Sequence, residues 1–381
     1  MILNFSVKNF RSVMEETIIS FTATADKTLS KYLIPTGKKN VLPIVALYGD
    51  VASGKSNIIA ALIRMRDMIC GKYSCLQPGE KLPFEPFAFT CDKNEYTAFE
   101  AEYIYKGIRY KYSFSYNETE ILSEKLNYWP NGREALVFSR NGLEYIFREN
   151  VSEQHSIAER TLRNRLYLRS SNDWNYAGTY DAIQWFISGI ISLNSENDIC
   201  FLSYLQDKEF RKMFIHELRN ADPSVCDLKE TENKYDIVYR INDSIKTVVP
   251  VEMQSSGFIR YYNLLAVCMT AFRTGSLVLA DNYDNNISER LTRRITELVI
   301  SPETNPEHAQ LLCAVHDTSL MDQSLLRRDE IYLTEKLYSC SGTVVHPVTY
   351  FSPRKDKRID YGYRNNEFKI EMQPYLNNPV K

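Results

Sequence analysis

One short segment constrains the fold of this chain more than any other: residues 49–56, which read GDVASGKS. The spacing satisfies GxxxxGK[ST], a pattern in which backbone N–H groups surround phosphates and the lysine reaches the outer ones. An apolar run at 41–49 precedes the loop, and 57–69 carries apolar residues at helical spacing. Because a phosphate-binding loop requires this order of strand, glycine loop and helix, the segment predicts an α/β core that binds a nucleotide.

The loop and the start of its helix supply most of the candidate binding residues. We expect Lys55 to reach the outer phosphates and the hydroxyl of Ser56 to bind Mg²⁺, which makes ATP and Mg²⁺ the expected cofactors. The alternative, a chance turn rich in glycine and serine, does not explain the flanking strand and helix. The expected nucleotide-binding residues here are Gly49, Asp50, Ala52, Ser53, Gly54, Lys55, Ser56 and Asn57.

A carboxylate that holds the metal is expected at the end of a second buried strand. The apolar run 276–280 leads into Asp281, and we expect Asp281 to join Ser56 as the second metal residue. An ordinary core strand that ends in an aspartate at a turn has the same pattern. Asp284, three residues on, is either a catalytic carboxylate or a solvated loop acid.

Two further features complete the candidate site. Ser255, Ser256 and Gly257 open an apolar helix, and small residues there let the backbone approach a phosphate closely, although Ser-Ser-Gly is also a plain N-cap. His316 lies at the end of a third buried strand within 309–317, where a histidine can sense a terminal phosphate. A histidine at a strand end is also commonly a structural residue.

Composition limits the classes of protein to which the chain can belong. The 46 Lys and Arg nearly balance the 48 Asp and Glu, so the total charge gives no support to a general affinity for nucleic acid. The longest apolar stretch, 182–193, is too short and too polar to cross a bilayer, so no membrane partner is expected. The chain starts without a signal-peptide pattern, and its eight cysteines are scattered without a CxxC pair. We expect a cytoplasmic protein without a zinc site.

The character of the sequence changes along the chain. Short alternating strands fill the first part, helical spacing follows from about residue 150, and buried strands return after about 248. We expect an α/β fold with an N-terminal antiparallel β subdomain and an inserted helical domain. The expected parts are 1–150 (first half of the head, with the phosphate loop and the antiparallel sheet), 151–247 (mostly helical insertion), 248–350 (second half of the head) and 351–381 (C-terminal tail).

Several elements inside these parts can be placed from the sequence. Lys106–Gly107 and Asn141–Gly142 are hairpin-turn signals, and helical spacing predicts helices at 156–168 and 179–193. The tail interleaves basic residues with tyrosines, which is typical of a nucleic-acid contact and also of a solvated flap that docks on another subunit. The basic residues of this pattern, in the segment 352–364, are Arg354, Lys355, Lys357, Arg358 and Arg364.

The order of these features resembles ATPase heads of the ABC type, in which a signature helix precedes the metal carboxylate and a switch histidine follows it. The chain more closely resembles the bacterial RloA-like AAA-family ATPases, which are relatives of the RecF, SMC and OLD proteins. The matching pieces span nearly the whole chain and are IxxFxVKNFRS, YGDVASGKSNI, the FEPFAF strand, RNRLYL, LRNADPSVCDL, SSGFIRYYNLL, HDTSLMD, RRDEIYLTEK and IDYGYRNNEF.

The resemblance implies a P-loop head of the ABC type that closes as a homodimer, or a higher oligomer, around ATP. Ser255 and Gly257 of one protomer then reach the nucleotide that Lys55 of another protomer holds. His316 becomes the switch residue, and 9–12 forms a turn near the nucleotide. The resemblance also implies anti-phage (abortive infection) defence, in which the chain controls a separate, co-encoded effector such as a nuclease or a toxin.

The chain departs from its relatives at the residues expected to catalyse hydrolysis. Asn282 stands where such ATPases usually have a glutamate as general base, and an amide cannot accept a proton from the attacking water. We therefore expect slow hydrolysis, in which Asn282 orients a water and Asp284 substitutes for the missing carboxylate. No acidic nuclease cluster follows the ATPase motifs, so an OLD-type nuclease domain is not expected.

Two other functions remain open. One is a RecF- or SMC-like repair protein in which ATP clamps a dimer on DNA, which makes nucleic acid an alternative partner. The near-neutral charge and the lack of a heptad run weigh against it. The other is a scaffold that binds nucleotide without hydrolysing it.

Overall fold

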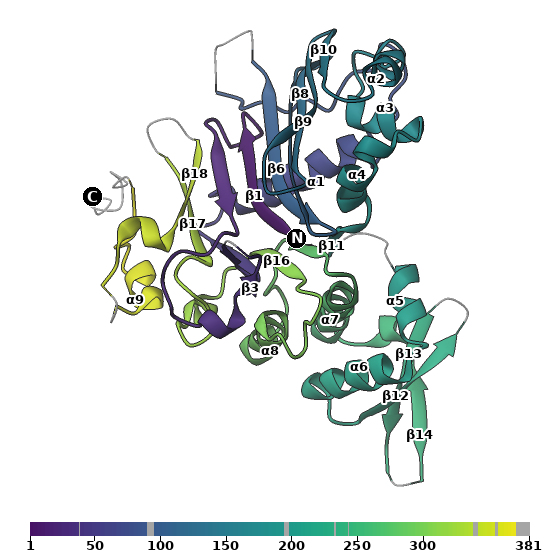
Figure 1. Ribbon diagram of the computed structural model, residues 1–381. Helices are drawn as coiled ribbons and strands as arrows, with labels where there is room; N and C mark the ends of the chain where they lie inside the picture. The colour runs from purple at the N-terminus through teal and green to yellow at the C-terminus, as the bar shows by residue number, and fades with distance from the viewer. Residues whose placement is uncertain are drawn as a thin grey trace.

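Two large β-sheets with a helix packed between them make up the body of the protein (Figure 1). The structure, a computed structural model, describes residues 1–37, 39–89, 95–193, 198–231, 234–242, 244–337, 342–354 and 357–370. Helix α1 (Lys55–Ile69) contacts both sheets, because its buried residues belong to the same core as the inner faces of the two sheets.

The central sheet is mostly parallel, and its strand order is β11-β15-β16-β5-β17-β18, with β18 antiparallel to β17. Alternate residues of β5 face two different cores: Val45 and Leu47 pack with α1, whereas Ala46 packs with α7 on the opposite face. A strand buried on both faces needs an apolar residue at every position, which explains the continuous run. The strands are β5 (Ile44–Tyr48), β11 (Ile190–Ser192), β15 (Leu277–Ala280), β16 (Gln310–Ala314), β17 (Ile331–Lys336) and β18 (Thr343–Pro347).

The second sheet is antiparallel, in the order β10-β9-β8-β7-β6-β1-β2, as the sequence predicted for the N-terminal part. Lys106 (φ 48°) and Gly107 (φ 76°) are both left-handed, which is the two-residue turn whose twist matches a hairpin. The next hairpin turns at Gly142 and Leu143, one residue later than predicted. The strands are β1 (Ile2–Lys8), β2 (Thr17–Ser20), β6 (Thr97–Tyr105), β7 (Ile108–Tyr116), β8 (Ile121–Trp129), β9 (Ala135–Asn141) and β10 (Glu144–Phe147).

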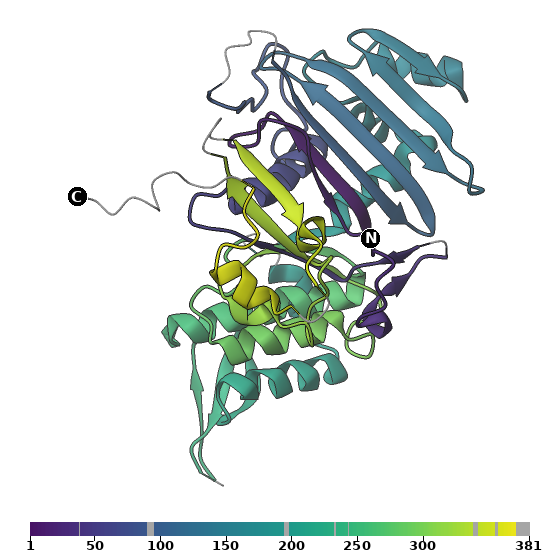
Figure 2. The same cartoon turned by 90° about the vertical axis from the view of Figure 1, so that its left-hand side faces the viewer.

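Two helices cover the face of the parallel sheet that points away from the antiparallel sheet (Figures 1 and 2). α7 (Ser256–Thr274) and α8 (Glu289–Ile300) pack on the face of the parallel sheet opposite α1. α9 (Ile359–Arg364) belongs to the segment that follows β18. Short elements are the strands β3 (Ile34–Pro35) and β4 (Asn40–Val41) and the 3₁₀ helices η1 (Ser30–Tyr32), η2 (Val251–Met253), η3 (Thr318–Met321) and η4 (Val348–Phe351).

The segment 151–247, which we expected as one helical insertion, is divided between two parts of the fold. Its first helices pack with the antiparallel sheet, and its later elements pack beside α7 and form an arm that projects from the body in Figure 1. The first group is α2 (Val151–Ala158), α3 (Tyr167–Asp173) and α4 (Ala177–Ser188). The second group is α5 (Asp198–Tyr204), α6 (Lys208–Ala221), β12 (Val225–Thr231), β13 (Lys234–Arg240) and β14 (Lys246–Val249).

The helix predicted at 156–168 is interrupted, and a buried ion pair explains the break. The Glu124 carboxylate accepts hydrogen bonds from the backbone N–H groups of Tyr167 (2.6 Å) and Leu168 (2.8 Å). The guanidinium of Arg140 donates to the carbonyl oxygen of Arg165 over 2.7 Å. Both charged side chains are almost fully buried, so these bonds replace the helical ones and turn the chain between α2 and α3.

Two further elements differ from the sequence-based expectation. The helix predicted at 179–193 ends at Ser188, and Ile190–Ser192 adds β11 to the parallel sheet beside β15. The FEPFAF segment, 84–89, is a loop instead of a strand. Among the described residues, no helix combines the length and the apolar character that a bilayer crossing demands.

Candidate functional site

The phosphate loop joins β5 to α1 with a backbone shape that only some residues adopt. Gly54, at the N-cap of α1, has a φ of 107°, and Ala52 has a φ of 64°. A Cβ atom on Gly54 would lie 2.1 Å from the Oγ1 atom of Thr343. No side chain caps α1, and an uncapped helix start leaves backbone N–H groups that can bind an anion.

Lys55 is buried and folds back over the loop. Its Nζ atom donates to the carbonyl oxygens of Gly49 (2.7 Å) and Asp50 (3.1 Å). Burial lowers the pKa of the Lys55 ammonium, and nearby carboxylates, that of Asp50 first, oppose the shift. The ammonium is therefore held at the loop by two neutral acceptors, which phosphate oxygens can replace with a stronger charged contact.

Ser12 and Thr343 hold the loop from outside. Thr343 Oγ1 lies 2.9 Å from the carbonyl oxygen of Ser53 and 2.7 Å from Ser12 Oγ. Asn57, at the start of α1, donates from Nδ2 to Ser12 Oγ over 2.7 Å. Ser12, in the turn that the resemblance placed near the nucleotide, thus contacts the helix start, whereas Thr343 carried no signal in the sequence.

Ser53 is buried, and a second threonine holds it. Its hydroxyl lies 2.6 Å from Oγ1 of Thr334, which in turn donates to the carbonyl oxygen of Tyr48 over 2.9 Å. Thr334 belongs to β17, the neighbour of β5, so the loop is fastened to the strand beside its own. No pattern in the sequence assigned this role to Thr334.

Ser56 and Asp281 meet as expected of a metal pair. The Ser56 hydroxyl donates to Asp281 Oδ1 over 2.9 Å. A hydroxyl and one carboxylate fit Mg²⁺, which prefers oxygen ligands and takes the remainder from water and substrate phosphates. No group of three or more His, Cys, Asp or Glu suited to a metal occurs within the described ranges.

Asn282 and His316 also lie together. Asn282 has a left-handed φ of 52°, and its Oδ1 atom is 3.3 Å from Nε2 of His316. Both side chains are exposed, and they follow the neighbouring strands β15 and β16. The amide and the imidazole can together orient a water or a phosphate oxygen at this edge of the sheet.

Asp284 is occupied by backbone contacts. Its Oδ2 atom accepts hydrogen bonds from the N–H groups of His316 (2.8 Å) and Asp317 (2.5 Å). Its Oδ1 atom is buried and has no partner among the described residues. The carboxylate therefore holds the turn after β16. A carboxylate with these two hydrogen bonds is neither a freely solvated loop acid nor a free base.

The Ser-Ser-Gly segment forms the N-terminus of α7. The Ser255 hydroxyl accepts a hydrogen bond from the N–H of Phe258 (3.3 Å), and α7 begins at Ser256. A Cβ atom on Gly257 would lie 2.8 Å from the carbonyl oxygen of Asn286, so glycine permits a close approach here. A shallow hollow of about 420 Å³ opens beside this turn and is lined by Ser256, Ile259, Arg260, Asn263, Asp281, Asn282, Asn285 and Asn286.

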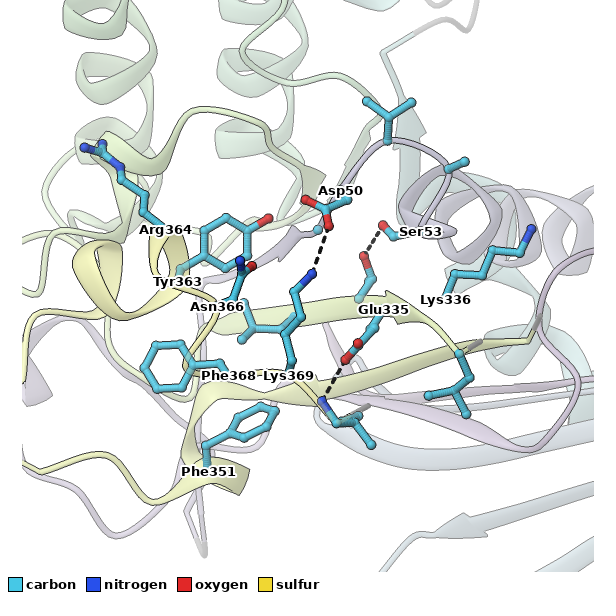
Figure 3. Close-up of a pocket in the computed structure, with 17 residues that line it drawn as sticks. Asp50, Ser53, Glu335, Lys336, Phe351, Tyr363, Arg364, Asn366, Phe368 and Lys369 are labelled. Carbon is cyan, nitrogen blue, oxygen red and sulfur yellow. Dashed lines mark hydrogen bonds and ion pairs between the residues drawn. The ribbon is translucent and has the colours of Figure 1, made fainter. Parts of the chain in front are cut away.

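A second pocket, of about 550 Å³, lies between the phosphate loop and the C-terminal segment (Figure 3). Lys369 points toward Asp50, with 3.3 Å between the ammonium and the carboxylate, and the N–H of Ile370 donates to Glu335 over 2.8 Å. The ring of Tyr363 packs edge-on against Tyr48, the last residue of β5. The predicted appended tail therefore forms one wall beside the loop.

The tail also reaches the turn after β16. The Arg364 guanidinium donates to the hydroxyl of Thr318, in η3, over 2.9 Å. Arg358 pairs with Asp360 of the tail itself. Lys355 and residues 371–381 lie outside the described residues. In the sequence, the similarity of IDYGYRNNEF to related proteins was the signal that this segment could belong to the site.

Comparison with known proteins places the chain among P-loop proteins. A family model described as "AAA domain, putative AbiEii toxin, Type IV TA system" matches residues 44–322. The SMC head domain from Thermotoga maritima is similar at 14% identity and a TM-score of 0.45, covering 91% of this chain and 98% of that chain. An SmcHead bound to the C-winged helix domain of ScpA is similar at 14% identity and a TM-score of 0.45, covering 92% and 99%. A search of curated proteins found no match.

Proposed function

The chain belongs to this AAA-domain family of P-loop ATPases, and we propose that it binds ATP with Mg²⁺ at the loop 49–56 and acts as a nucleotide-controlled switch. Two observations carry the proposal: the buried Lys55 ammonium lies on the carbonyl oxygens of the loop, and the hydroxyl of the next residue, Ser56, donates to the Asp281 carboxylate. When held by Ser56 and Asp281, the metal would supply positive charge that offsets the charge of the phosphates.

We propose that two subunits close over the nucleotide. Ser255, Ser256 and Gly257 of one subunit then face the phosphates that Lys55 of the other subunit holds. The exposed N-terminus of α7 supports this arrangement, because the N–H groups of a first helical turn attract an anion. In such a dimer each subunit contributes one half of both sites.

Hydrolysis in this proposal is slow. Asn282 orients a water without removing its proton, and Asp284 already accepts two backbone hydrogen bonds. His316 senses the terminal phosphate from beside Asn282. ATP then acts as a ligand that favours the assembled state, and the output is a shift of population between two states.

We propose further that the switch controls a separate, co-encoded effector in an anti-phage (abortive infection) system. The family description, which names a toxin and a TA system, supports this setting. Neighbouring genes test it directly. A nuclease or toxin gene beside this one is expected, whereas replication or repair genes there would contradict it in favour of a DNA-clamping repair role.

A second candidate function is a scaffold that binds ATP and never hydrolyses it. The occupied carboxylate of Asp284, next to an amide at 282, favours this reading. Phosphate release measured with the effector present distinguishes the two: any release above that of Lys55→Ala identifies a slow ATPase.

Binding of ATP and Mg²⁺ to the purified chain is the test of the proposed function. Equilibrium dialysis should show retention of ATP with Mg²⁺, and Lys55→Ala should weaken it at least tenfold, because a buried charged donor is lost. Lys106→Ala is the matched control, since Lys106 lies on an exposed hairpin far in sequence from the loop and pairs only at the surface. Wild-type protein that retains no ATP, or Lys55→Ala that retains it as well, would refute the proposal.

A further inference from the structure

Arg260 links the N-terminal turn of α7 to the strand end that carries the candidate metal carboxylate. Its guanidinium donates from one nitrogen, Nη2, to the carbonyl oxygens of Asp281 (3.0 Å) and Asn282 (2.7 Å). Arg260 lies five residues after the N-cap Ser255, in the helix that begins at Ser256. One side chain therefore joins the carbonyl groups of Asp281 and Asn282 to α7, about one turn after the Ser-Ser-Gly segment.

Asp281 is held at both ends by these contacts. Its carboxylate accepts the hydroxyl of Ser56 from the phosphate-loop helix, and its carbonyl oxygen accepts Arg260 from α7. The next residue, Asn282, has the left-handed backbone that turns the chain back toward α7. The position of the carboxylate relative to Ser56 thus depends on where the N-terminal part of α7 lies.

The charge of Arg260 is incompletely compensated, which distinguishes it from a surface arginine. Its Nε atom is buried and has no partner among the described residues. Burial lowers the pKa of the guanidinium, and the carboxylates of Asp281 and Asp284 oppose the shift. The two carbonyl acceptors and the nearby carboxylates stabilise this half-buried cation, and its hydrogen bonds in turn fix the backbone at Asp281 and Asn282.

We propose that Arg260 is a positioning residue that places Asp281 and Asn282 for the metal and couples this placement to the occupant of the α7 N-terminus. The inference rests on the proposed function and deepens it. A triphosphate that another subunit presents to Ser255–Gly257 contacts the same helix, α7, about one turn before Arg260. By linkage, occupation of that turn and metal binding at Ser56 and Asp281 must then strengthen each other equally.

Three variants test the coupling through binding. Arg260→Met keeps the length of the side chain and removes its donors, Arg260→Lys keeps a cation that can reach one carbonyl, and Arg273→Met is the control at the other end of α7. Arg273 is exposed and pairs with Asp207. The readout is the Mg²⁺ concentration that half-saturates ATP binding in equilibrium dialysis, beside ATP binding in EDTA.

Arg260→Met is expected to raise the half-saturating Mg²⁺ concentration about tenfold, because the carboxylate is no longer held opposite Ser56. Arg260→Lys should give an intermediate shift and Arg273→Met none. ATP binding in EDTA should stay within twofold of wild type, because the Lys55 loop is untouched. A residue that only stabilised the fold would weaken binding in EDTA and in Mg²⁺ alike.

A wild-type Mg²⁺ requirement in Arg260→Met overturns the inference, as does an equal loss of ATP binding in EDTA. If Arg260→Met does not fold, Arg260→Lys decides: an unchanged requirement refutes the role and a several-fold rise supports it. Failure of the proposed function is a separate result, because it is seen in wild-type protein that binds no ATP. If wild-type protein binds ATP with Mg²⁺ and the Arg260 variants have the same Mg²⁺ requirement, only the inference about Arg260 is refuted.

Discussion

The hydroxyl of Ser56 donates to the carboxylate of Asp281 over 2.9 Å, although 225 positions separate the two residues in the chain. Each follows the carboxyl end of a parallel strand, β5 for Ser56 and β15 for Asp281, and both strands pair with β16. The carboxyl ends of parallel strands meet at one edge of a sheet, which is where such folds bind ligands. The candidate metal pair is thus a consequence of strand order.

Replacing Asn282 by glutamate should accelerate single-turnover hydrolysis about 10²-fold, because a general base is restored at the water. Quenched single-turnover assays measure the rate. Asn282→Gln is the matched control: it has the size of glutamate and no basic oxygen. Both variants place a longer side chain on a left-handed residue, which should lower the free energy of unfolding by about 1 kcal/mol.

Equal rates in wild type and Asn282→Glu would show that the chain already has an effective base, and the slow-switch proposal would then be wrong. A gain in Asn282→Gln as large as in Asn282→Glu would assign the effect to side-chain size.

Asp284→Ala should lower the free energy of unfolding by about 1–3 kcal/mol, because two backbone N–H groups lose their charged acceptor. Asp284→Asn retains an oxygen acceptor and should recover part of that loss while leaving turnover within a few-fold of wild type. Urea denaturation and single-turnover assays provide the two readouts. An Asp284→Asn variant that is stable but inactive would instead identify Asp284 as the base.

Gly54→Ala should weaken ATP binding more than tenfold and destabilise the fold, since its Cβ atom would lie 2.1 Å from Thr343 Oγ1 in a left-handed backbone. Gly79→Ala is the control for backbone strain alone. Gly79 also has a left-handed φ, of 82°, but nothing lies within 4 Å of its Cβ position. Dialysis should show unchanged ATP binding in Gly79→Ala; a matching loss there would rule out crowding by Thr343 as the cause.

Stability should depend on pH through Glu330. Burial raises the pKa of this carboxyl to about 8, and the Asp329 charge adds to the rise, while the N–H and the charge of Arg327 oppose it. The folded chain therefore binds the proton more tightly than the unfolded chain. The resulting stability is fully present below the ordinary glutamate pKa of about 4.3 and is lost as pH rises through 8.

Glu330→Gln removes this titration, so the variant should gain stability relative to wild type between pH 5 and pH 8 by up to a few kcal/mol. Urea denaturation at the two pH values measures the change. Glu118→Gln, at an exposed carboxylate, is the control. Parallel pH profiles for wild type and Glu330→Gln would show that Glu330 does not titrate in this range.

The elements that the sequence predicted well are those whose signals are local. The β6–β7 hairpin follows from two residues that turn together, and the continuous apolar run of β5 follows from burial on both faces. The helix predicted at 156–168 failed for the opposite reason. Its periodicity was helical, but Glu124 and Arg140, from two other strands, hold the backbone in a different shape.

The site shows the same division. The pattern of the phosphate loop identified Lys55 and Ser56, whereas no pattern in the sequence assigned a role to Thr334, Thr343 or Arg260. Each of these side chains acts through a hydroxyl or guanidinium that donates to a carbonyl oxygen of a different element. Residue type alone does not distinguish such a side chain from a solvated one.

By itself, the sequence determined the phosphate loop, the strands that flank it and the candidate residues at their ends, because strand, turn and helix preferences act over a few neighbouring residues. Only the tertiary structure decided that Asp284 holds a turn, that Arg260 reaches behind Asp281, and that the tail lies against the loop. Those contacts join distant segments, and which segments meet is set by the packing of both sheets around their two cores.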